Sequence, residues 1–277
     1  TGHFLPPRIV TNDDLSKHLN TTDEWIQERT SIKERCYVEM GVGSSDLAIP
    51  ATEQALKAAN LKVGDIDFII FATSTPDFYA PGSGCLLQEK MGFNEIGALD
   101  IRVQCSGFLY GLSIAEQYIK TGMFKNILLI GAEVQSTAMD LTDKGRETAV
   151  IFGDGAGAAV ISATEEDKGI LSTHMHSEGK YAKELWLESP ASNAGHPRIT
   201  KKDLDKGKQY LKMNGREVFR HAVIRFPEVI NECLEKNNLT IDNIDFLIPH
   251  QANLRITQMI QKRLGLKDDQ IFSTIHK

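Results

Sequence analysis

The sequence predicts an α/β protein built mainly on parallel sheets. Apolar runs of strand length alternate along the chain with longer stretches in which apolar residues recur at three- and four-residue spacing. In addition, one segment of the first half of the chain recurs in the second half. Because strand–helix alternation is typical of parallel sheets covered by helices, and a recurring segment indicates a duplicated unit, we expect two similar halves.

The expected strands are short and apolar, and the expected helices are amphipathic. The strands are Ile66–Thr73, Ala98–Val103, Ile127–Gly131 and Phe246–Pro249. The helices are Asp46–Ala59, Gly107–Thr121, Arg216–Asn237 and Asn253–Leu264. The segment Ala149–Ser162 differs, because two β-rich runs flank the glycine-rich stretch Gly153–Gly157. We therefore expect a hairpin with a tight turn there.

The recurring segment is Ala55–Ile70, which resembles Cys233–Ile248. Both copies combine a helix end, an Asn-Leu turn and an Ile-Asp-Phe that opens a strand; a chance match is the alternative. In the second half, Ile271–Ile275 would be the next strand, and the loop that matches the one after Ala98–Val103 would follow Lys277. We therefore expect the second half to continue beyond this sequence, since its sheet would otherwise keep an open edge.

Composition and charge exclude several classes of protein. The 277 residues are 41% hydrophobic, which is enough for one large core or two medium ones. The net charge of −6 argues against a general nucleic-acid or membrane binder, because both partners are anionic. The four cysteines show no CxxC spacing and indicate free thiols in a reducing cytoplasm.

Cys105 stands between the expected strand Ala98–Val103 and the expected helix Gly107–Thr121. Backbone N–H groups at the start of a helix stabilise a thiolate, so we expect this placement to lower the pKa of the Cys105 thiol. The glycine at position 107 would allow a sharp turn and a close approach of substrate. Cys105 is therefore a candidate nucleophile; a small packing residue is the alternative.

His250 also follows an expected strand and precedes an expected helix. At the carboxyl end of a strand, a neutral imidazole would donate a hydrogen bond or move a proton. The alternative is a capping segment, with Asn253 as the N-cap and His250 as an ordinary loop residue. Cys105 and His250 occupy related places in the two halves, so a pseudo-twofold arrangement would bring them to one cleft. That favours a nucleophile with an imidazole partner.

Two further groups of side chains are weaker candidates. Arg255 and Lys262 fall on one face of the expected helix after His250, which suits an anionic partner; ordinary surface charge is the alternative. His174 and His176 are spaced like metal ligands, but no third ligand lies at a familiar spacing, so a structural role is preferred.

Five motifs, in order along the chain, resemble β-ketoacyl-acyl-carrier-protein synthase III of the thiolase superfamily. They are Asp23–Ile26, Ala72–Asp77, Cys105–Phe108, Phe152–Ala158 and Pro249–Arg255. The resemblance implies a thiolase-like α/β fold of five αβαβα layers, with halves at residues 1–163 and 164–277. It also implies a homodimer in the cytoplasm.

The activity implied by the resemblance is the condensation that initiates fatty acid synthesis. Cys105 would take an acyl group from acyl-CoA, and His250 with an asparagine would bind the thioester carbonyl of malonyl-acyl-carrier protein. Loss of CO₂ would leave an enolate that attacks the acyl-cysteine. No cofactor is implied, since acyl-CoA is a substrate, and neither nucleic acid nor membrane is an expected partner.

The resemblance also implies binding residues. The positions expected to bind substrate or CoA are Thr21, Trp25, Arg29, Lys144, Gly215, Phe219 and Asn253. Those expected to face the acidic carrier protein are Arg220, Arg255, Lys262 and Arg263. An indole and a guanidinium suit the adenine of CoA.

The sequence departs from the family pattern at three places. The family's asparagine, in a Gly-Asn-Thr loop, and a glycine-rich segment would follow Lys277, so we expect the chain as given to load an acyl group without condensing it. Lys144 stands where an arginine is common, with Arg146 close by. Ala80 stands where some relatives have a phenylalanine that closes the acyl pocket, which predicts tolerance of primers longer than acetyl.

Other functions remain open from the sequence. Within the superfamily, the alternative is a synthase III-like acyltransferase of secondary metabolism. From other classes, the alternatives are a Cys-His thioester hydrolase and an inactive homologue that acts as a structural partner. The hydrolase would need a group that orients His250, and spacing assigns none.

Overall fold

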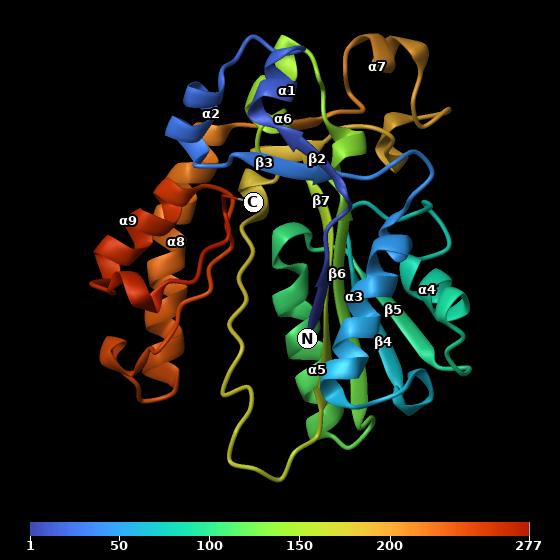
Figure 1. Ribbon diagram of the computed structural model, residues 1–277, viewed down its shortest axis with the longest axis vertical. Helices are drawn as coiled ribbons and strands as arrows, with labels where there is room; N and C mark the ends of the chain where they lie inside the picture. The colour runs from blue at the N-terminus through green and yellow to red at the C-terminus, as the bar shows by residue number, and fades with distance from the viewer. Residues whose placement is uncertain (277) are drawn as a thin grey trace. The chain divides into compact units, whose positions relative to one another are not determined.

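The computed structural model describes residues 1–276 and shows a mixed α/β fold (Figure 1). Contacts within the chain divide it into two units. The first unit is Thr1–Ile9, Cys36–Gln135 and Gly153–Thr173, and the second is Val10–Arg35, Ser136–Phe152 and His174–Lys277. The predicted boundary between residues 163 and 164 stays a prediction, and Lys277, the last residue of the predicted second half, lies outside the described residues.

The first unit is built on a five-stranded sheet with the strand order β1-β7-β6-β4-β5. The strands of the chain are β1 (Gly2–Phe4), β2 (Arg8–Thr11), β3 (Glu34–Tyr37), β4 (Phe68–Ala72), β5 (Gly97–Ile101), β6 (Asn126–Val134), β7 (Asp154–Ser162), β8 (Leu185–Leu187) and β9 (Leu211–Met213). β4 runs parallel to both β5 and β6, whereas β7 is antiparallel to β6 and β1. The three strands expected in the first half, Ile66–Thr73, Ala98–Val103 and Ile127–Gly131, are confirmed as β4, β5 and β6.

Helices cover both faces of this sheet. The helices of the chain are α1 (Asn12–Ser16), α2 (Asp23–Thr30), α3 (Ser44–Ala59), α4 (Ser83–Met91), α5 (Gly107–Lys120), α6 (Arg146–Ala149), α7 (Lys201–Asp205), α8 (Gly215–Lys236) and α9 (Leu254–Leu264). Successive residues of β4 point to opposite faces, so Ile69 and Phe71 pack in the cluster under α3, whereas Ile70 packs in the cluster under α5. The sheet is thus buried on both sides, as parallel sheets usually are.

The four expected helices are confirmed as α3, α5, α8 and α9, with ends that differ by no more than two residues. Asn253 is the N-cap of α9, as the alternative interpretation of this segment had it, because its side-chain oxygen accepts a hydrogen bond from the Arg255 N–H at 2.8 Å. No helix among residues 1–276 is both long enough and apolar enough to cross a membrane.

The expected hairpin around Gly153–Gly157 is wrong. The segment forms one continuous strand, β7, whose Gly155 pairs with Glu133 of β6 and whose Gly157 pairs with His3 of β1. Small residues let β7 lie between two strands beneath α3, whose side chains share a core with Ala156 and Ala158. A Cβ at Gly155 would lie 3.1 Å from a Leu5 side-chain carbon, so this glycine allows close packing and forms no turn, whereas no atom lies within 4 Å of a Cβ at Gly157.

The recurring segment is confirmed at the level of local structure. Asn60 and Asn238 both adopt a left-handed conformation, with φ of 54° and 55°, at the ends of α3 and α8. The leucine after each asparagine donates to a leucine carbonyl five residues back, at 3.0 Å from Leu61 and 2.9 Å from Leu239. A 3₁₀ turn follows in both copies, over Val63–Asp65 and Ile241–Asn243.

The expected strands of the second half are wrong beyond this point. Phe246–Pro249 forms a single parallel bridge, between Leu247 and Ile271, and no strand. Phe246 and Ile248 are 68% and 72% exposed, so the segment is not buried. An apolar segment becomes a strand only when a second strand pairs with it along its length. Within residues 1–276, Phe246–Pro249 pairs with another segment at the Leu247–Ile271 bridge alone.

Candidate active site

Cys105 lies at the carboxyl edge of the parallel strands, as predicted. β5 ends at Ile101, a 3₁₀ turn spans Gln104–Ser106, and α5 begins at Gly107. The glycine is needed there, since a Cβ at Gly107 would lie 2.9 Å from the Ala72 Cβ at the end of β4. All four cysteines are free, as expected, and the Cys105 side chain reaches the surface.

The expected lowering of the Cys105 pKa is wrong, because its pKa is raised. Neighbouring protein atoms remove part of the hydration of the thiol, and this desolvation is the largest cause. The negative charge of Glu133 adds to the increase, and a hydrogen bond from the Cys105 backbone N–H opposes it. The start of α5 therefore stabilises the thiolate less than desolvation and the Glu133 carboxylate destabilise it. The resting thiol is neutral.

Sequence reasoning missed Glu133, the penultimate residue of β6. Its carboxylate accepts hydrogen bonds from the Ser74 backbone N–H (2.8 Å), the Ser74 hydroxyl (2.8 Å), the Thr75 hydroxyl (2.7 Å) and Gln135 Nε2 (3.2 Å). Ser74 and Thr75 follow β4, so this cluster lies at the same edge of the sheet as Cys105. The sequence did offer a signal, because Glu133 is an acidic residue near the end of a mainly apolar strand. A partly buried carboxylate needs hydrogen-bond donors, so polar neighbours could have been expected around it.

His250 lies in the second unit, in the loop that leads to α9. The expectation that it ends a strand is wrong, because only the Leu247 bridge precedes it. Its neighbour Gln251 anchors the loop by accepting a hydrogen bond from the Thr274 N–H at 2.6 Å. Partial desolvation lowers the pKa of the His250 imidazole, so the ring stays neutral at neutral pH.

Trp25 and Arg29, the expected adenine-binding pair, lie together in the second unit. The Arg29 guanidinium carbon lies 4.2 Å from the centroid of the Trp25 ring, and the Arg146 guanidinium carbon lies 4.6 Å from it. Arg146 Nη1 also donates to the Asn20 carbonyl oxygen at 2.8 Å. Arg146 is thus a second cation that contacts the indole. Lys144, expected to bind CoA, is exposed in a 3₁₀ turn, and its role stays a prediction.

The remaining expected CoA-binding residues occupy different surroundings within the second unit. The Thr21 hydroxyl is buried and has no hydrogen-bond partner among the described residues, as a group awaiting a ligand would have. Gly215 begins α8, and Phe219 packs on the cluster that joins α8 to α9. Asn253 uses its side-chain oxygen to cap α9.

The four expected carrier-protein residues are on α8 and α9, which pack together. Arg220 is paired with Glu217 at 2.6 Å, and Arg263 donates to the Val223 carbonyl oxygen. Neither Arg255 nor Lys262 pairs with a carboxylate within residues 1–276, and both are exposed. Arg255, Lys262 and Arg263 thus carry positive charge that no carboxylate among the described residues pairs with.

The other candidates contribute less. Ala80 is exposed in the loop between β4 and α4. His174 and His176 both bond to the Glu232 carboxylate, at 2.9 and 2.6 Å, and no three-ligand metal cluster is found among residues 1–276.

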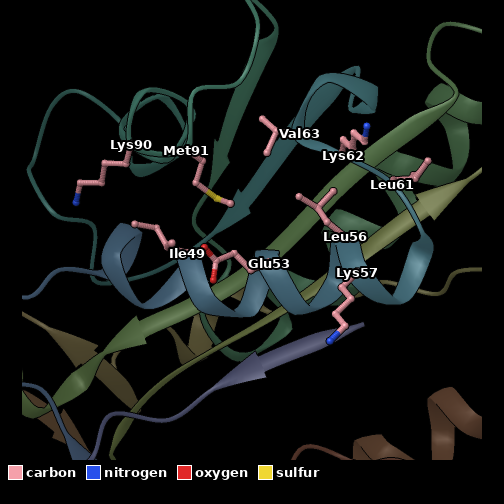
Figure 2. A pocket seen from close by; sticks show the side chains of 9 residues that line it. All are labelled: Ile49, Glu53, Leu56, Lys57, Leu61, Lys62, Val63, Lys90 and Met91. Atoms are coloured by element: carbon pink, nitrogen blue, oxygen red, sulfur yellow. The ribbon is translucent and has the colours of Figure 1, made fainter.

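A surface hollow of about 540 Å³ lies elsewhere, between α3 and α4. Figure 2 shows the side chains that line it, and no predicted site residue is among them. They are Ile49, Glu53, Leu56, Lys57, Leu61, Lys62, Val63, Lys90 and Met91.

Known proteins match the chain over its whole length. A family model described as 3-oxoacyl-[acyl-carrier-protein] synthase III covers residues 99–179, and the model of its C-terminal part covers residues 234–277. The beta-ketoacyl-[acyl-carrier-protein] synthase III of Caldanaerobacter subterraneus subsp. tengcongensis is 44% identical over 277 residues, which are 100% of this chain and 82% of that protein. The protein of the same name from Xylella fastidiosa is 42% identical over 279 residues, with the same coverage.

The structure agrees with the sequence comparison. The crystal structure of 3-oxoacyl-[acyl-carrier-protein] synthase III from Aquifex aeolicus VF5 superposes with a TM-score of 0.89 at 40% identity, covering 100% of this chain and 83% of that one. This similarity confirms the predicted thiolase-like α/β fold. The chain therefore belongs to the β-ketoacyl-acyl-carrier-protein synthase III family.

Proposed function

We propose that the protein catalyses the decarboxylating condensation of an acyl-CoA primer with malonyl-acyl-carrier protein, the step that initiates fatty acid synthesis. The observation that carries this proposal is the place of Cys105, at the carboxyl edge of parallel strands and at the start of α5, in a chain 44% identical to a synthase III. A nucleophile in this position is open to substrate and held by the scaffold.

The first half-reaction is acyl transfer to Cys105. The Cys105 sulfur attacks the thioester carbonyl of acyl-CoA, a carbon–sulfur bond forms, and the carbon–sulfur bond to CoA breaks. The proton of the Cys105 thiol ends on the sulfur of the departing CoA. Because the pKa of the Cys105 thiol is raised, the thiol is neutral at rest and must lose this proton during the half-reaction.

The second half-reaction is decarboxylation and condensation. The bond between the malonyl carboxylate and its neighbouring carbon breaks, CO₂ leaves, and the electron pair remains as an enolate. The enolate attacks the acyl carbonyl, the bond to the Cys105 sulfur breaks, and the departing thiolate takes up a proton from water, which restores the resting thiol. His250 is neutral and donates an N–H to the enolate oxygen. The second donor is the asparagine that the resemblance places after Lys277.

Intact-mass measurement after incubation with acyl-CoA tests the first half-reaction. A synthase gains the mass of the acyl group and keeps it in water. On a chain that also carries the expected asparagine loop, it releases the acyl group only to malonyl-acyl-carrier protein. A hydrolase loses the acyl group in water, and an inactive homologue never gains it. Either of the last two results would contradict the proposal.

We expect replacement of Trp25 with alanine to raise the KM for acyl-CoA by about tenfold. The substitution removes the indole face over which Arg29 and Arg146 lie, and an aromatic–base stack contributes about 1–3 kcal/mol. Steady-state acyl transfer with varied acyl-CoA measures the change. Trp186→Ala is the matched control, since it removes an indole over which Lys183 and Lys212 lie at 5.5 Å and which has no expected contact with CoA. An equal rise in KM from Trp186→Ala would contradict the proposed role of Trp25.

We expect Ala80→Phe to narrow the range of primers. A small residue leaves room for acyl chains longer than acetyl, and a phenyl ring fills that room. Competition between acetyl-CoA and longer acyl-CoAs, scored by the mass added to Cys105, measures the preference. A wild-type protein that accepts only acetyl-CoA would contradict the predicted role of Ala80.

The proposed partners follow from charge and sheet topology. Arg255 and Lys262, with Arg220 and Arg263 beside them, form a basic face for an acidic carrier protein. β5 is an edge strand of the sheet, which supports the proposed homodimer by offering unpaired backbone groups to a second copy. We also propose a cytoplasmic location and a reaction without a cofactor, with neither nucleic acid nor membrane as a partner.

A further inference from the structure

Glu133 is held in one position by an unusually complete set of donors. Oε1 accepts from the Ser74 backbone N–H, and Oε2 accepts from the Ser74 hydroxyl, the Thr75 hydroxyl and Gln135. The Thr75 hydroxyl in turn accepts from the Val134 N–H at 2.8 Å. The carboxylate therefore ties the turn after β4 to the end of β6, and charge-assisted hydrogen bonds of this kind are strong.

The same edge of the sheet carries Cys105. Ala72, the last residue of β4, pairs with Ile101 of β5 and Gly131 of β6, so β4 and β5 end side by side while β6 continues to Val134. The start of α5 rests on Ala72, as the 2.9 Å distance from a Cβ at Gly107 shows. Cys105 and Glu133 each lie a few residues beyond these paired positions, within the first unit.

Other charged groups on the neighbouring elements do not act on the thiol in the same way. Asp77, after β4, accepts hydrogen bonds from the Ser45 N–H and hydroxyl, and Glu116 of α5 is paired with Lys120 at 2.6 Å. Arg102, after β5, is exposed. Among the described residues, Glu133 is the charged group that raises the pKa of Cys105.

We propose that Glu133 is a positioning residue of the acyl-transfer site, which fixes the Ser74–Thr75 turn and holds its carboxylate at the sheet edge that carries Cys105. The proposal rests on the proposed function. A nearby carboxylate disfavours a thiolate, so the resting Cys105 thiol reacts more slowly with electrophiles than it would without Glu133. The acylated sulfur is neutral, so the same charge does not oppose the acyl-enzyme.

The test is the rate at which iodoacetamide alkylates Cys105, followed by mass spectrometry of its peptide between about pH 6 and pH 10. Glu133→Gln preserves the size and shape of the side chain. The amide oxygen can still accept the hydrogen bond from the Ser74 N–H, and the amide NH₂ can donate to the Ser74 and Thr75 hydroxyls. We expect alkylation at pH 7 to become roughly 3- to 10-fold faster, with the profile moved to lower pH. Glu133→Asp, which withdraws the charge by one methylene, is expected to give an intermediate rate.

Glu95→Gln, which removes an exposed carboxylate of the same unit, is the control and is expected to leave the rate unchanged. An unchanged alkylation profile in Glu133→Gln overturns the proposal, whether or not the melting temperature falls, because a purely structural role would lower stability alone. If Glu133→Gln does not fold, a wild-type rate in Glu133→Asp overturns it instead. Alkylation needs no acyl-CoA, so failure of acyl loading in the wild type would reject the proposed function without deciding the role of Glu133.

Discussion

Cys105→Ala is expected to abolish transfer of an acyl group from acyl-CoA to the protein and to reduce overall synthesis by at least about 10³-fold. The substitution removes the sulfur that would form the covalent intermediate and leaves the strand, the 3₁₀ turn and α5 in place. The exposed position of Cys105 means that little packing is lost, so the protein should fold normally. Intact mass after incubation with acetyl-CoA measures the acyl transfer.

Cys85→Ala provides the matched control. Cys85 is half-buried in α4, and its thiol donates to the Gly82 carbonyl oxygen at 3.0 Å. This control is expected to keep full acylation while losing a weak hydrogen bond. If Cys105→Ala still gains the acyl mass, another residue is the nucleophile and the proposed mechanism is wrong.

The core of the first unit could be predicted because its signals are local. β4 is a continuous apolar run, which a strand buried on both faces requires, and α3 and α5 repeat apolar residues at helical spacing. The Asn-Leu pairs at Asn60 and Asn238 could be recognised for the same reason, since a left-handed asparagine ends a helix by purely local geometry.

The two wrong predictions of strands concern segments whose structure depends on pairing with residues distant in the sequence. β7 has the composition of a turn, yet it pairs along its length with β6 and at its centre with β1. Phe246–Pro249 has the composition of a buried strand, yet a single bridge joins Leu247 to Ile271. Local composition does not report which backbone groups will find a neighbour, and that neighbour decides whether a strand forms.

The candidate site shows the same division. The order of strand, Cys105 and helix is encoded locally, and it is confirmed. The charges around Cys105 are not encoded locally, because Glu133 comes from another strand. Desolvation and the Glu133 carboxylate together reverse the expected direction of the shift in the Cys105 pKa. Likewise, Arg146 reaches Trp25 from a different part of the chain. The sequence thus predicted Cys105 as a candidate nucleophile, whereas its electrostatic surroundings depend on residues from other strands.

His250→Ala is expected to separate the two half-reactions. Acyl loading of Cys105 should persist, because the nucleophile and its surroundings in the first unit are unchanged. Release of CO₂ from malonyl-acyl-carrier protein should fall by about 10²–10³-fold, the usual cost of removing one donor to a developing oxyanion. Both rates are to be measured on a chain that also carries the asparagine loop expected after Lys277, so that the second donor is present in the reference.

Two comparisons make the His250 result specific. His18→Ala removes an exposed imidazole from the end of α1 and should change neither rate. His250→Asn keeps an N–H donor and is expected to retain part of the decarboxylation, which a merely structural role would not predict. If acyl loading falls as far as CO₂ release, His250 moves the proton of the Cys105 thiol instead, because an oxyanion donor reserved for malonyl would leave the loading step intact.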